Sequence, residues 1–143
     1  MTAALGITLI SCAQNDLPAA VKSTFDKKFP TATSVKWDKE NDTEWEAEFK
    51  NNGISYSANF SIDGTWVETE HKVSRKDLPS EITAVLSKDF ADYKIEEVEQ
   101  FEKPNSSGYD IEIEKDEELL ELVFDNSGKL IEKKAIQEEE EEK

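Results

Sequence analysis

Residues 43–67, with the sequence TEWEAEFKNNGISYSANFSIDGTWV, decide the fold of this chain. Apolar and polar residues alternate in this stretch with a period of two, so each of its three short runs has one apolar and one polar face. The runs are separated by Asn51-Asn52-Gly53 and by Asp63-Gly64. These residue types favour tight turns because they tolerate a positive φ angle. The stretch therefore predicts a three-stranded antiparallel meander.

The same alternation recurs later in the chain at one constant offset. Seven positions of the first meander have counterparts of the same kind in the second. Tyr109, Ile111, Ile113, Leu120, Leu122, Phe124 and Gly128 follow Trp45, Ala47, Phe49, Tyr56, Ala58, Phe60 and Gly64. We therefore expect a second meander from Tyr109 to about Ala135.

Each meander is preceded by a predicted helix with one apolar stripe. Asp16-Leu17-Pro18 opens the first helix, since Asp is a good N-cap and Pro suits the first turn, and Pro30 ends it. Asp77-Leu78-Pro79 opens the second helix in the same way. Apolar residues at four-residue spacing form the stripes: Val21, Phe25 and Phe29 in the first helix, and Ile82, Leu86 and Phe90 in the second. We expect Phe25 and Phe90 to be buried where each helix meets the sheet.

One further strand is predicted between each helix and its meander. The first covers residues 34–37 and is followed by a charged loop at 38–42. The second covers residues 94–103, with a bulge because its apolar residues do not alternate cleanly, and is followed by a loop at 104–108.

The fold class is therefore α+β, a tandem repeat of one helix plus four antiparallel strands, with the helices packed on one face of the sheet or sheets. We expect the first repeat at residues 14–73 and the second at 74–136. The strands would form either one eight-stranded sheet or two four-stranded sheets. Residues 137–143 are rich in glutamate, which predicts a disordered acidic tail because like charges in a block repel one another.

The amino terminus has the features of an export segment, at residues 1–13. Leu9-Ile10-Ser11-Cys12 resembles a bacterial lipobox, in which Cys12 would be lipidated and become the first mature residue. Alternatively, Ser11-Cys12-Ala13 resembles the small-x-small site of an ordinary signal peptidase, which would cut before Gln14. The basic residues that normally begin such segments are missing, so an apolar terminus of a cytosolic protein stays open as an alternative.

Charge and cysteine content exclude several classes of function. The 143 residues carry a formal net charge of −16, which disfavours binding to nucleic acid or to an anionic membrane surface, because both need clustered Lys and Arg. The charge favours a basic protein partner or divalent cations. Cys12 is the single cysteine, so no disulfide forms within the chain.

Leu-Pro-x-x-Val/Ile with spaced aromatic residues, followed by a meander that closes in Asp-Gly or Ser-Gly, resembles the PepSY-like family of secreted bacterial proteins. The resemblance covers Leu17 to Ile136. In the first repeat it rests on Leu17, Pro18, Val21, Phe25, Phe29, Trp37, Trp45, Phe49, Tyr56, Phe60 and Gly64. The second repeat has counterparts of these residues. The family is related in fold to beta-lactamase inhibitor protein. The resemblance implies a non-enzymatic binding or inhibitory module without a cofactor, in the periplasm or on the surface of a Gram-negative bacterium. Membrane attachment would occur only through a lipid anchor at Cys12.

The strand faces opposite the predicted core are the candidate protein-binding face. A solvated sheet face is one interpretation, and a recognition surface for an unknown protein partner is the sharper one. Trp66 bears on the choice, because a two-residue turn at Asp63-Gly64 would place it outside among the acids, as an interface anchor, whereas a longer turn would place it in the core. The candidate residues are Glu44, Glu46, Glu48, Trp66, Glu68, Asp110, Glu112 and Glu114.

Other chemistry is weakly indicated. Asp38, Glu40 and Asp42 alternate before Glu44, so an envelope binder of divalent cations or small ligands, acting through acidic loops, is the alternative function. The glycine of an EF-hand loop is absent there, and we assign no metal ligand. His71 has no partner for zinc and is expected to end a strand in water. The carboxylates are expected in solvated rows without an apolar pocket, so a hydrolase is disfavoured and no catalytic residue is assigned.

Overall fold

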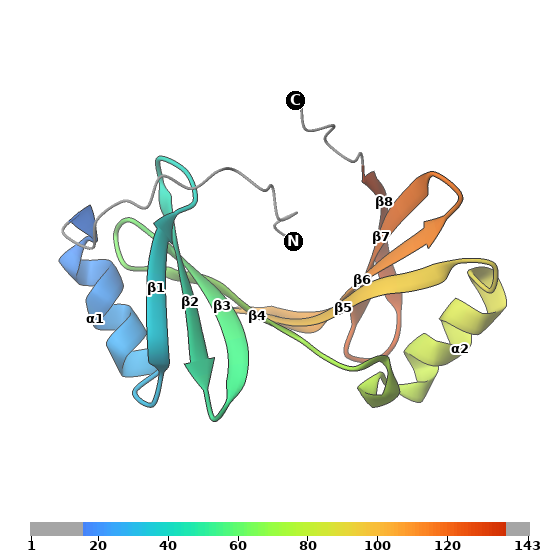
Figure 1. Ribbon diagram of the computed structural model, residues 1–143, viewed down its shortest axis with the longest axis horizontal. Coiled ribbons are helices and arrows are strands. Elements are labelled where there is room, and N and C mark those ends of the chain that lie inside the picture. Colours follow the sequence, from blue (N-terminus) through green and yellow to red (C-terminus); the bar gives the residue numbers. More distant parts are fainter. Residues whose placement is uncertain (1–15, 137–143) are drawn as a thin grey trace. The chain divides into compact units, whose positions relative to one another are not determined.

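The computed structural model describes residues 16–136, which form two α-helices, one 3₁₀ turn and eight strands (Figure 1). In chain order the elements are α1 (Ala19–Lys28), β1 (Thr33–Lys39), β2 (Glu44–Asn51), β3 (Ile54–Ser61), β4 (Trp66–Lys72), η2 (Arg75–Asp77), α2 (Ser80–Asp89), β5 (Lys94–Lys103), β6 (Ser106–Lys115), β7 (Glu118–Asp125) and β8 (Leu130–Ile136). The predicted export segment with Cys12 and the predicted acidic tail lie outside the described residues. Within residues 16–136, neither helix is long and apolar enough to cross a membrane.

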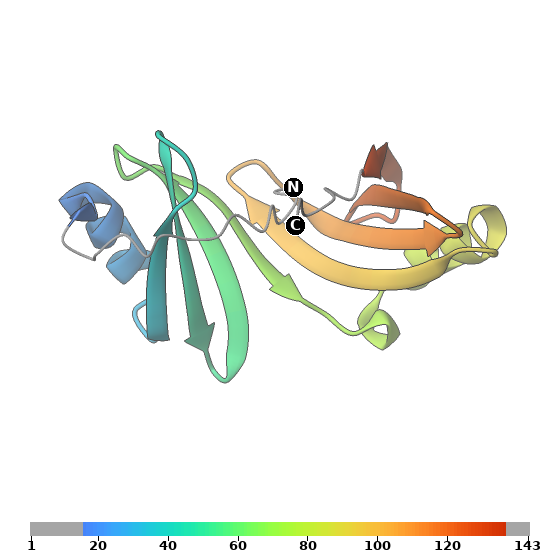
Figure 2. The ribbon, with the colours of Figure 1, turned by 45° about the horizontal axis from the view of Figure 1, so that its top comes forward.

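The chain divides into two compact units. The first takes the described residues up to His71 together with Glu102–Asn105, and the second takes Lys72–Phe101 and the described residues from Ser106 onward. The strands of each sheet region follow sequence order, β1 to β4 and β5 to β8. In the turned view of Figure 2, β2 and β3 run side by side, as do β6 and β7, and both pairs are antiparallel. The predicted α+β class with antiparallel strands is confirmed.

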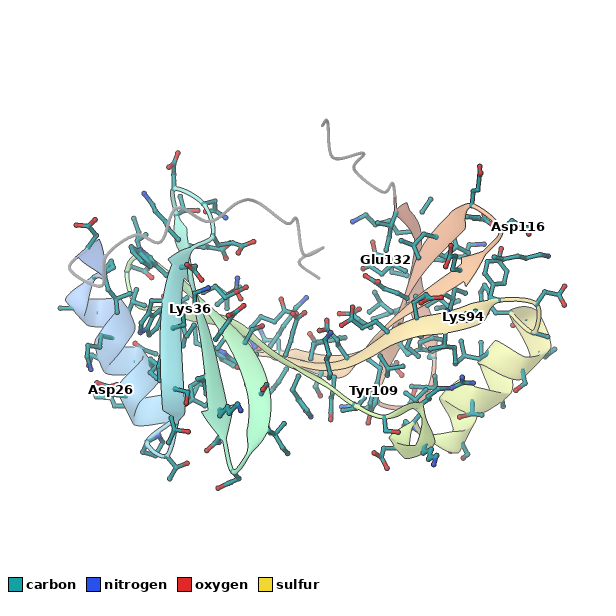
Figure 3. All side chains as sticks on the ribbon, in the orientation of Figure 1. Asp26, Lys36, Lys94, Tyr109, Asp116 and Glu132 are labelled. Atoms are coloured by element: carbon teal, nitrogen blue, oxygen red, sulfur yellow. The ribbon has the colours of Figure 1, made fainter. Side chains whose placement is uncertain are left out.

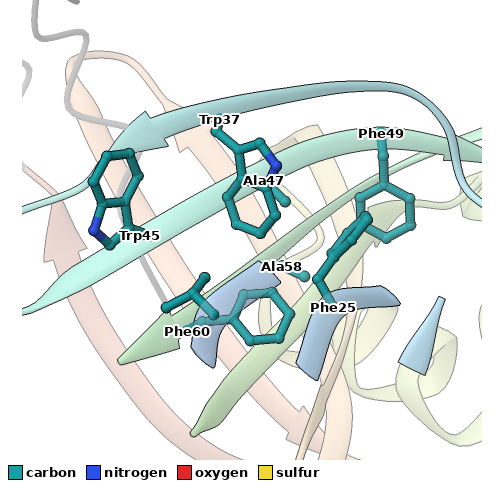
Figure 4. Close-up of a cluster of buried hydrophobic side chains, with 8 residues drawn as sticks. Phe25, Trp37, Trp45, Ala47, Phe49, Ala58 and Phe60 are labelled. Carbon is teal, nitrogen blue, oxygen red and sulfur yellow. The ribbon is translucent and has the colours of Figure 1, made fainter. Parts of the chain in front are cut away.

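The core of the first unit lies between α1 and one face of its strands. The Phe25 ring lies 5.1 Å from the Trp37 ring, 5.1 Å from the Phe49 ring and 6.1 Å from the Phe60 ring, measured between centroids (Figure 4). Aromatic pairs at such distances stabilise a core beyond the area that they bury. Together with Val21 of α1 and Trp45 of β2, these rings are shielded from solvent. The apolar stripe of α1 is therefore buried against the apolar face of the meander, as the period-two pattern predicts.

The second unit buries an aliphatic core in the same manner. Ile82 and Leu86 of α2 pack with Ile111 and Ile113 of β6, and with apolar residues of β5 and β7. Phe90 is the C-cap residue of α2 and is only half-buried, beside Tyr93. The expectation that Phe90 is buried at the helix–sheet contact is therefore wrong, because Leu86 stands one turn earlier at the position that Phe25 occupies in α1.

A glycine in the last turn of each meander lies against the first turn of the helix. Gly64 has a φ of +91°, and a Cβ atom there would lie 2.7 Å from the backbone oxygen of Ala20. Gly128 has a φ of +86°, and a Cβ atom there would overlap the side chain of Glu81 in α2. These glycines thus permit both the turn and the close approach of the helix.

Several predicted boundaries differ from the structure. Pro18, and not Asp16, is the N-cap of α1, and no side chain caps the helix. β1 extends through Asp38 and Lys39, which were expected in a loop, because they pair with Glu46 and Trp45 of β2. β6 begins at Ser106 rather than at Tyr109, so the connection from β5 is a short turn.

Candidate protein-binding face

The face of the first unit that points away from α1 carries two cross-strand rows of polar residues. We call it the first helix-free face. One row runs Asp38, Glu46, Asn59 and Glu68 across β1 to β4. The parallel row runs Lys36, Glu48, Ser57 and Glu70, and Figure 3 labels Lys36 on β1. Glu44 lies at the end of β2 on the same face, opposite Ser61, and accepts a hydrogen bond from the Asn41 side chain at 3.1 Å.

Burial on this face is greater than a solvated row would show. Asp38 exposes 4% of its surface, Asn59 5% and Glu68 7%, whereas Glu48 is exposed and Glu46 is half-buried. The expectation of a fully solvated acidic row is therefore wrong for Glu68. Strand parity assigns these residues to the face but does not reveal their burial.

Two lysines offset part of the negative charge of this face. Lys36 Nζ lies 3.1 Å from Asp38 Oδ2, and Lys103 Nζ lies 3.7 Å from Glu68 Oε1. Burial, together with the charges of Glu40 and Glu48, raises the pKa of Glu46 to about 7. Desolvation and like charges both favour the neutral carboxylic acid, so Glu46 titrates near neutral pH and a nearby positive charge would hold it ionised.

Trp66 lies on the opposite side of the sheet from these acids. A register shift between Asn59 and Phe60 pairs Trp66 with Phe60, which turns the indole to the core side. Lys28 of α1 lies 3.6 Å from the centroid of the indole ring, and the indole N–H donates to Thr69 Oγ1 at 2.9 Å. The expectation that Trp66 is an exposed anchor of the binding face is wrong, and the alternative of a tryptophan tucked toward the core is the observed one.

The second unit has a comparable face opposite α2, which we call the second helix-free face. Asp110, Glu112 and Glu114 of β6 pair with Val123, Glu121 and Leu119 of β7. Glu121 and Val123 pair in turn with Lys134 and Glu132 of β8, and Figure 3 labels Glu132 on that strand. Asp110 is 4% exposed and Glu121 2% exposed, while Glu112 and Glu114 are half-buried. The solvated-row expectation is therefore wrong for Asp110 as well.

The charges of the second unit also favour protonated carboxyl groups. Burial raises the pKa of Glu112 and of Glu121, with nearby carboxylates adding to the effect. Burial and the charge of Glu97 raise the pKa of Glu99, in β5, to about 6. Glu97 is paired with Lys72 at 2.5 Å. This surface therefore concentrates acidic groups that are costly to ionise without a counter-charge.

The other residues that the sequence singled out contact neighbouring side chains. The His71 ring lies beside the Tyr56 ring, with centroids 4.8 Å apart and planes tilted by 39°. His71 is half-buried and burial lowers its pKa, so the expectation that it lies in water is wrong. In the acidic segment before β2, Asp38 pairs with Lys36, and Asp42 lies 3.9 Å from Lys39. A shallow depression on the outer side of α1 is lined by Ala19, Lys22, Ser23, Asp26 and Lys27, all of them exposed. It has no buried titratable group that could serve as an acid or base.

The candidate residues predicted from the sequence did not include Asp38 and Glu121, which are central members of the two faces. The signal for Asp38 was available, because it follows the apolar Trp37 and so continues the alternation of the strand. Alternation does assign Glu121 to the face opposite the core, but it does not indicate that Glu121 is buried there.

Comparison with known proteins supports the architecture. The sequence model of the family described as "Putative beta-lactamase-inhibitor-like, PepSY-like" matches residues 8–56 and 43–132. The comparison with curated proteins gave no match.

Solved structures from Bacteroides share the fold. A BLIP-like protein from Bacteroides fragilis is 22% identical, with a TM-score of 0.77 over 87% of this chain and 90% of the other. A DUF2874 family protein from Bacteroides ovatus is 28% identical, with a TM-score of 0.75 over 82% and 86%. A structure from Bacteroides eggerthii, titled "putative periplasmic proteins", is 21% identical, with a TM-score of 0.74 over 83% and 88%. With the family match extending over most of its length, the chain belongs to the beta-lactamase-inhibitor-like, PepSY-like family.

Proposed function

We propose that this protein is an exported, non-enzymatic binding module that holds a protein partner on its helix-free sheet faces. The observation that carries the proposal is the row formed by Asp38, Glu46, Asn59 and Glu68, which is polar yet largely shielded from solvent. A solvated surface has no need of half-buried carboxyls. A surface that receives positive charge gains from them, because a desolvated acid interacts strongly with a cation.

The partner's contact surface is basic in this proposal. The formal net charge of −16 would steer a basic partner toward the chain and speed the encounter. The raised pKa of Glu46, about 7, means that ionisation of this group is incomplete near neutral pH. A lysine or arginine of the partner would stabilise the ionised form and release a proton, so binding is expected to tighten as the pH rises through 7.

Family membership and the similar solved structures support a non-enzymatic binding function and a location in the cell envelope. The family description and the Bacteroides fragilis neighbour both carry the likeness to an inhibitor, which favours binding over catalysis. The description of the Bacteroides eggerthii neighbour favours the periplasm. We place this chain in the envelope of a Gram-negative bacterium, with export directed by residues 1–13 and either a lipid on Cys12 or cleavage before Gln14.

We propose further that the two units are copies of one repeat, at residues 14–73 and 74–136. Both meanders shift register at the same repeat position, between Asn59 and Phe60 and between Val123 and Phe124. Both place a turn glycine against the first turn of the preceding helix. The helices then occupy the same side of the sheet in each copy, which leaves the opposite side to the partner.

The test is capture of the partner by cross-linking in intact envelopes, followed by binding assays with the purified partner. Reversing Glu46 and Glu48 to Lys should weaken binding, because the change places two positive charges on the first helix-free face. The matched control is reversal of Asp26 and Asp89 to Lys, which makes the same change in net charge at exposed helix positions. The proposal fails if the partner binds the face variant as tightly as it binds the control.

A further inference from the structure

Among the acidic side chains of the described residues, Glu121 is the most deeply buried one, and one of its carboxyl oxygens has no hydrogen-bond partner. It lies in the middle of β7 and exposes 2% of its surface. Its Oε2 atom accepts no hydrogen bond from residues 16–136. No ion pair within 4.0 Å joins it to Lys134, its cross-strand neighbour on β8, in this part of the chain.

The neighbours of Glu121 increase the cost of its charge. Glu112 is directly opposite on β6, and like charges in that position repel. Burial raises the pKa of Glu121, the charge of Asp110 raises it further, and Lys134 lowers it in part, while Glu132 on β8 adds a smaller repulsion. A buried carboxylate without a donor is costly. A charged donor at this position would therefore supply a large interaction.

We propose that Glu121 receives the ammonium group of a lysine side chain from the protein partner. This inference rests on the proposed function and names the chemistry that the second helix-free face recognises. An ammonium group is compact and carries three donors. Once the atoms that cover Glu121 Oε2 move aside, one donor would satisfy this oxygen. The others would reach toward Glu112, which is directly opposite on β6, so two acidic residues on one face would share one positive charge.

The surroundings of Glu121 also favour a lysine side chain over a free metal ion. Val123 lies two residues further along the same face of β7 and is 8% exposed, so a largely buried apolar side chain adjoins the carboxyl group. The aliphatic stem of a lysine would pack against the exposed edge of this side chain while its ammonium group reaches the acid. A hydrated metal ion lacks such a stem, and we infer that the site favours the side chain over the free ion.

The test uses the full chain with carbon-13-labelled glutamate and follows the carboxyl resonances by NMR. The probe is the tripeptide acetyl-Gly-Lys-Gly-amide, and its control is the same peptide with an acetylated lysine nitrogen. We expect the lysine peptide to shift the Glu121 resonance saturably and to lower the pKa of Glu121, and the acetylated peptide to do neither. Magnesium chloride at matched ionic strength tests the metal alternative. A response to magnesium but not to the peptide would overturn the proposal, as would equal responses to the two peptides.

Variants separate this site from its surroundings. Glu121→Gln keeps the shape of the side chain, removes its charge and should weaken lysine-peptide binding about tenfold or more, the loss expected when a charge-assisted hydrogen bond is removed. Glu132→Gln makes the same chemical change at an exposed position of the same face and should change binding less than about twofold, because exposed pairs contribute little. Equal weakening by both variants would refute a specific role for Glu121.

The same variants distinguish failure of this inference from failure of the proposed function. Suppose that the partner identified by cross-linking binds Glu121→Gln as tightly as the unmodified chain, yet loses affinity when Glu46 and Glu48 are replaced by Lys. The proposed lysine site is then wrong, and the proposed binding function stands. If reversal of Glu46 and Glu48 has no more effect than the helix control, the proposed function is wrong. Loss of binding in Glu121→Gln with unchanged thermal unfolding supports the lysine site.

Discussion

Replacing Gly64 by alanine should destabilise the first unit more than replacing Gly53. Both residues have a positive φ, +91° and +80°, so each alanine adds a backbone strain of roughly 1–2 kcal/mol. The sites differ in the space around the new methyl group. At Gly53 no atom lies within 4 Å, whereas at Gly64 the methyl group would lie 2.7 Å from the Ala20 backbone oxygen and 3.0 Å from its Cβ atom.

The difference between the two variants therefore isolates the contact between the turn and the helix. Backbone atoms of α1 cannot rotate away as a flexible side chain can, so α1 must shift, and overpacking of this kind costs about 1–3 kcal/mol. We expect Gly53→Ala to lower the free energy of unfolding by roughly 1–2 kcal/mol, and Gly64→Ala by roughly 2–5 kcal/mol. Urea unfolding of both variants, followed by tryptophan fluorescence, measures the difference. Equal losses would refute the close approach of α1 to this turn.

Three further predictions concern the core, the acidic faces and the amino terminus. Phe25→Ala should lower the free energy of unfolding by about 3–5 kcal/mol because Phe25 fills the centre of the first core. Phe90→Ala should lower it clearly less because Phe90 is half-buried. Urea unfolding midpoints test this, and equal losses would contradict it. Glu46→Gln should stabilise the protein at pH 8 and have little effect at pH 4. The pKa of Glu46 is about 7 in the folded chain against 4.5 unfolded, so the folded state loses stability as the pH rises between these values. Thermal unfolding at both pH values tests this, and the same stabilisation at both would argue against the raised pKa. Mass spectrometry of protein purified from native envelopes should find a mature chain that begins at a lipidated Cys12 or at Gln14, and an intact Met1 would rule out both forms of processing.

The strands could be predicted because turn chemistry and alternation agree. Asp63-Gly64 ends β3 and Asn52-Gly53 joins β2 to β3, and the bounds of β5 match the predicted residues 94–103. The errors occur at the ends of strands. Asp38 and Lys39 have the charge of a loop, yet they continue the ladder because β2 provides partners for them. Local composition does not show how far a partner strand extends.

The position of Trp66 shows how a bulge defeats strict alternation. Counting by twos from a two-residue turn places this residue outside, and the same count correctly pairs Glu68 with Asn59 and Glu70 with Ser57. The register shift between Asn59 and Phe60 changes the pairing only on the turn side of the bulge, where Trp66 pairs with Phe60. Leu130 pairs with Phe124 as Trp66 pairs with Phe60. The next residue is also apolar in both copies, Val67 and Ile131, so apolar character alone does not indicate which of the two neighbours faces the core.

Membership of the acidic faces could be predicted, but their electrostatics could not. Alternation correctly places Glu46, Glu48, Asp110 and Glu112 opposite the core residues. The pKa of Glu46 depends on burial and on the charges of Glu40 and Glu48, and Glu121 is 2% exposed although alternation predicts only its face. Such properties arise only once the register of several strands is fixed.

The central claim is that a basic partner binds the helix-free faces. Its most direct test uses the partner that cross-linking identifies, in purified form, and measures by calorimetry how its affinity depends on salt. The account predicts that affinity falls as salt rises from about 50 to 300 mM, because screening shortens the range of the charges to less than about 10 Å. It also predicts that reversal of Glu46 and Glu48 to Lys removes most of both the affinity and its salt dependence, while the melting temperature changes little. Binding that is insensitive to salt and to this reversal, but is lost when Glu40 and Asp42 are neutralised or when divalent cations are chelated, would contradict binding on the helix-free faces and favour a cation-binding loop.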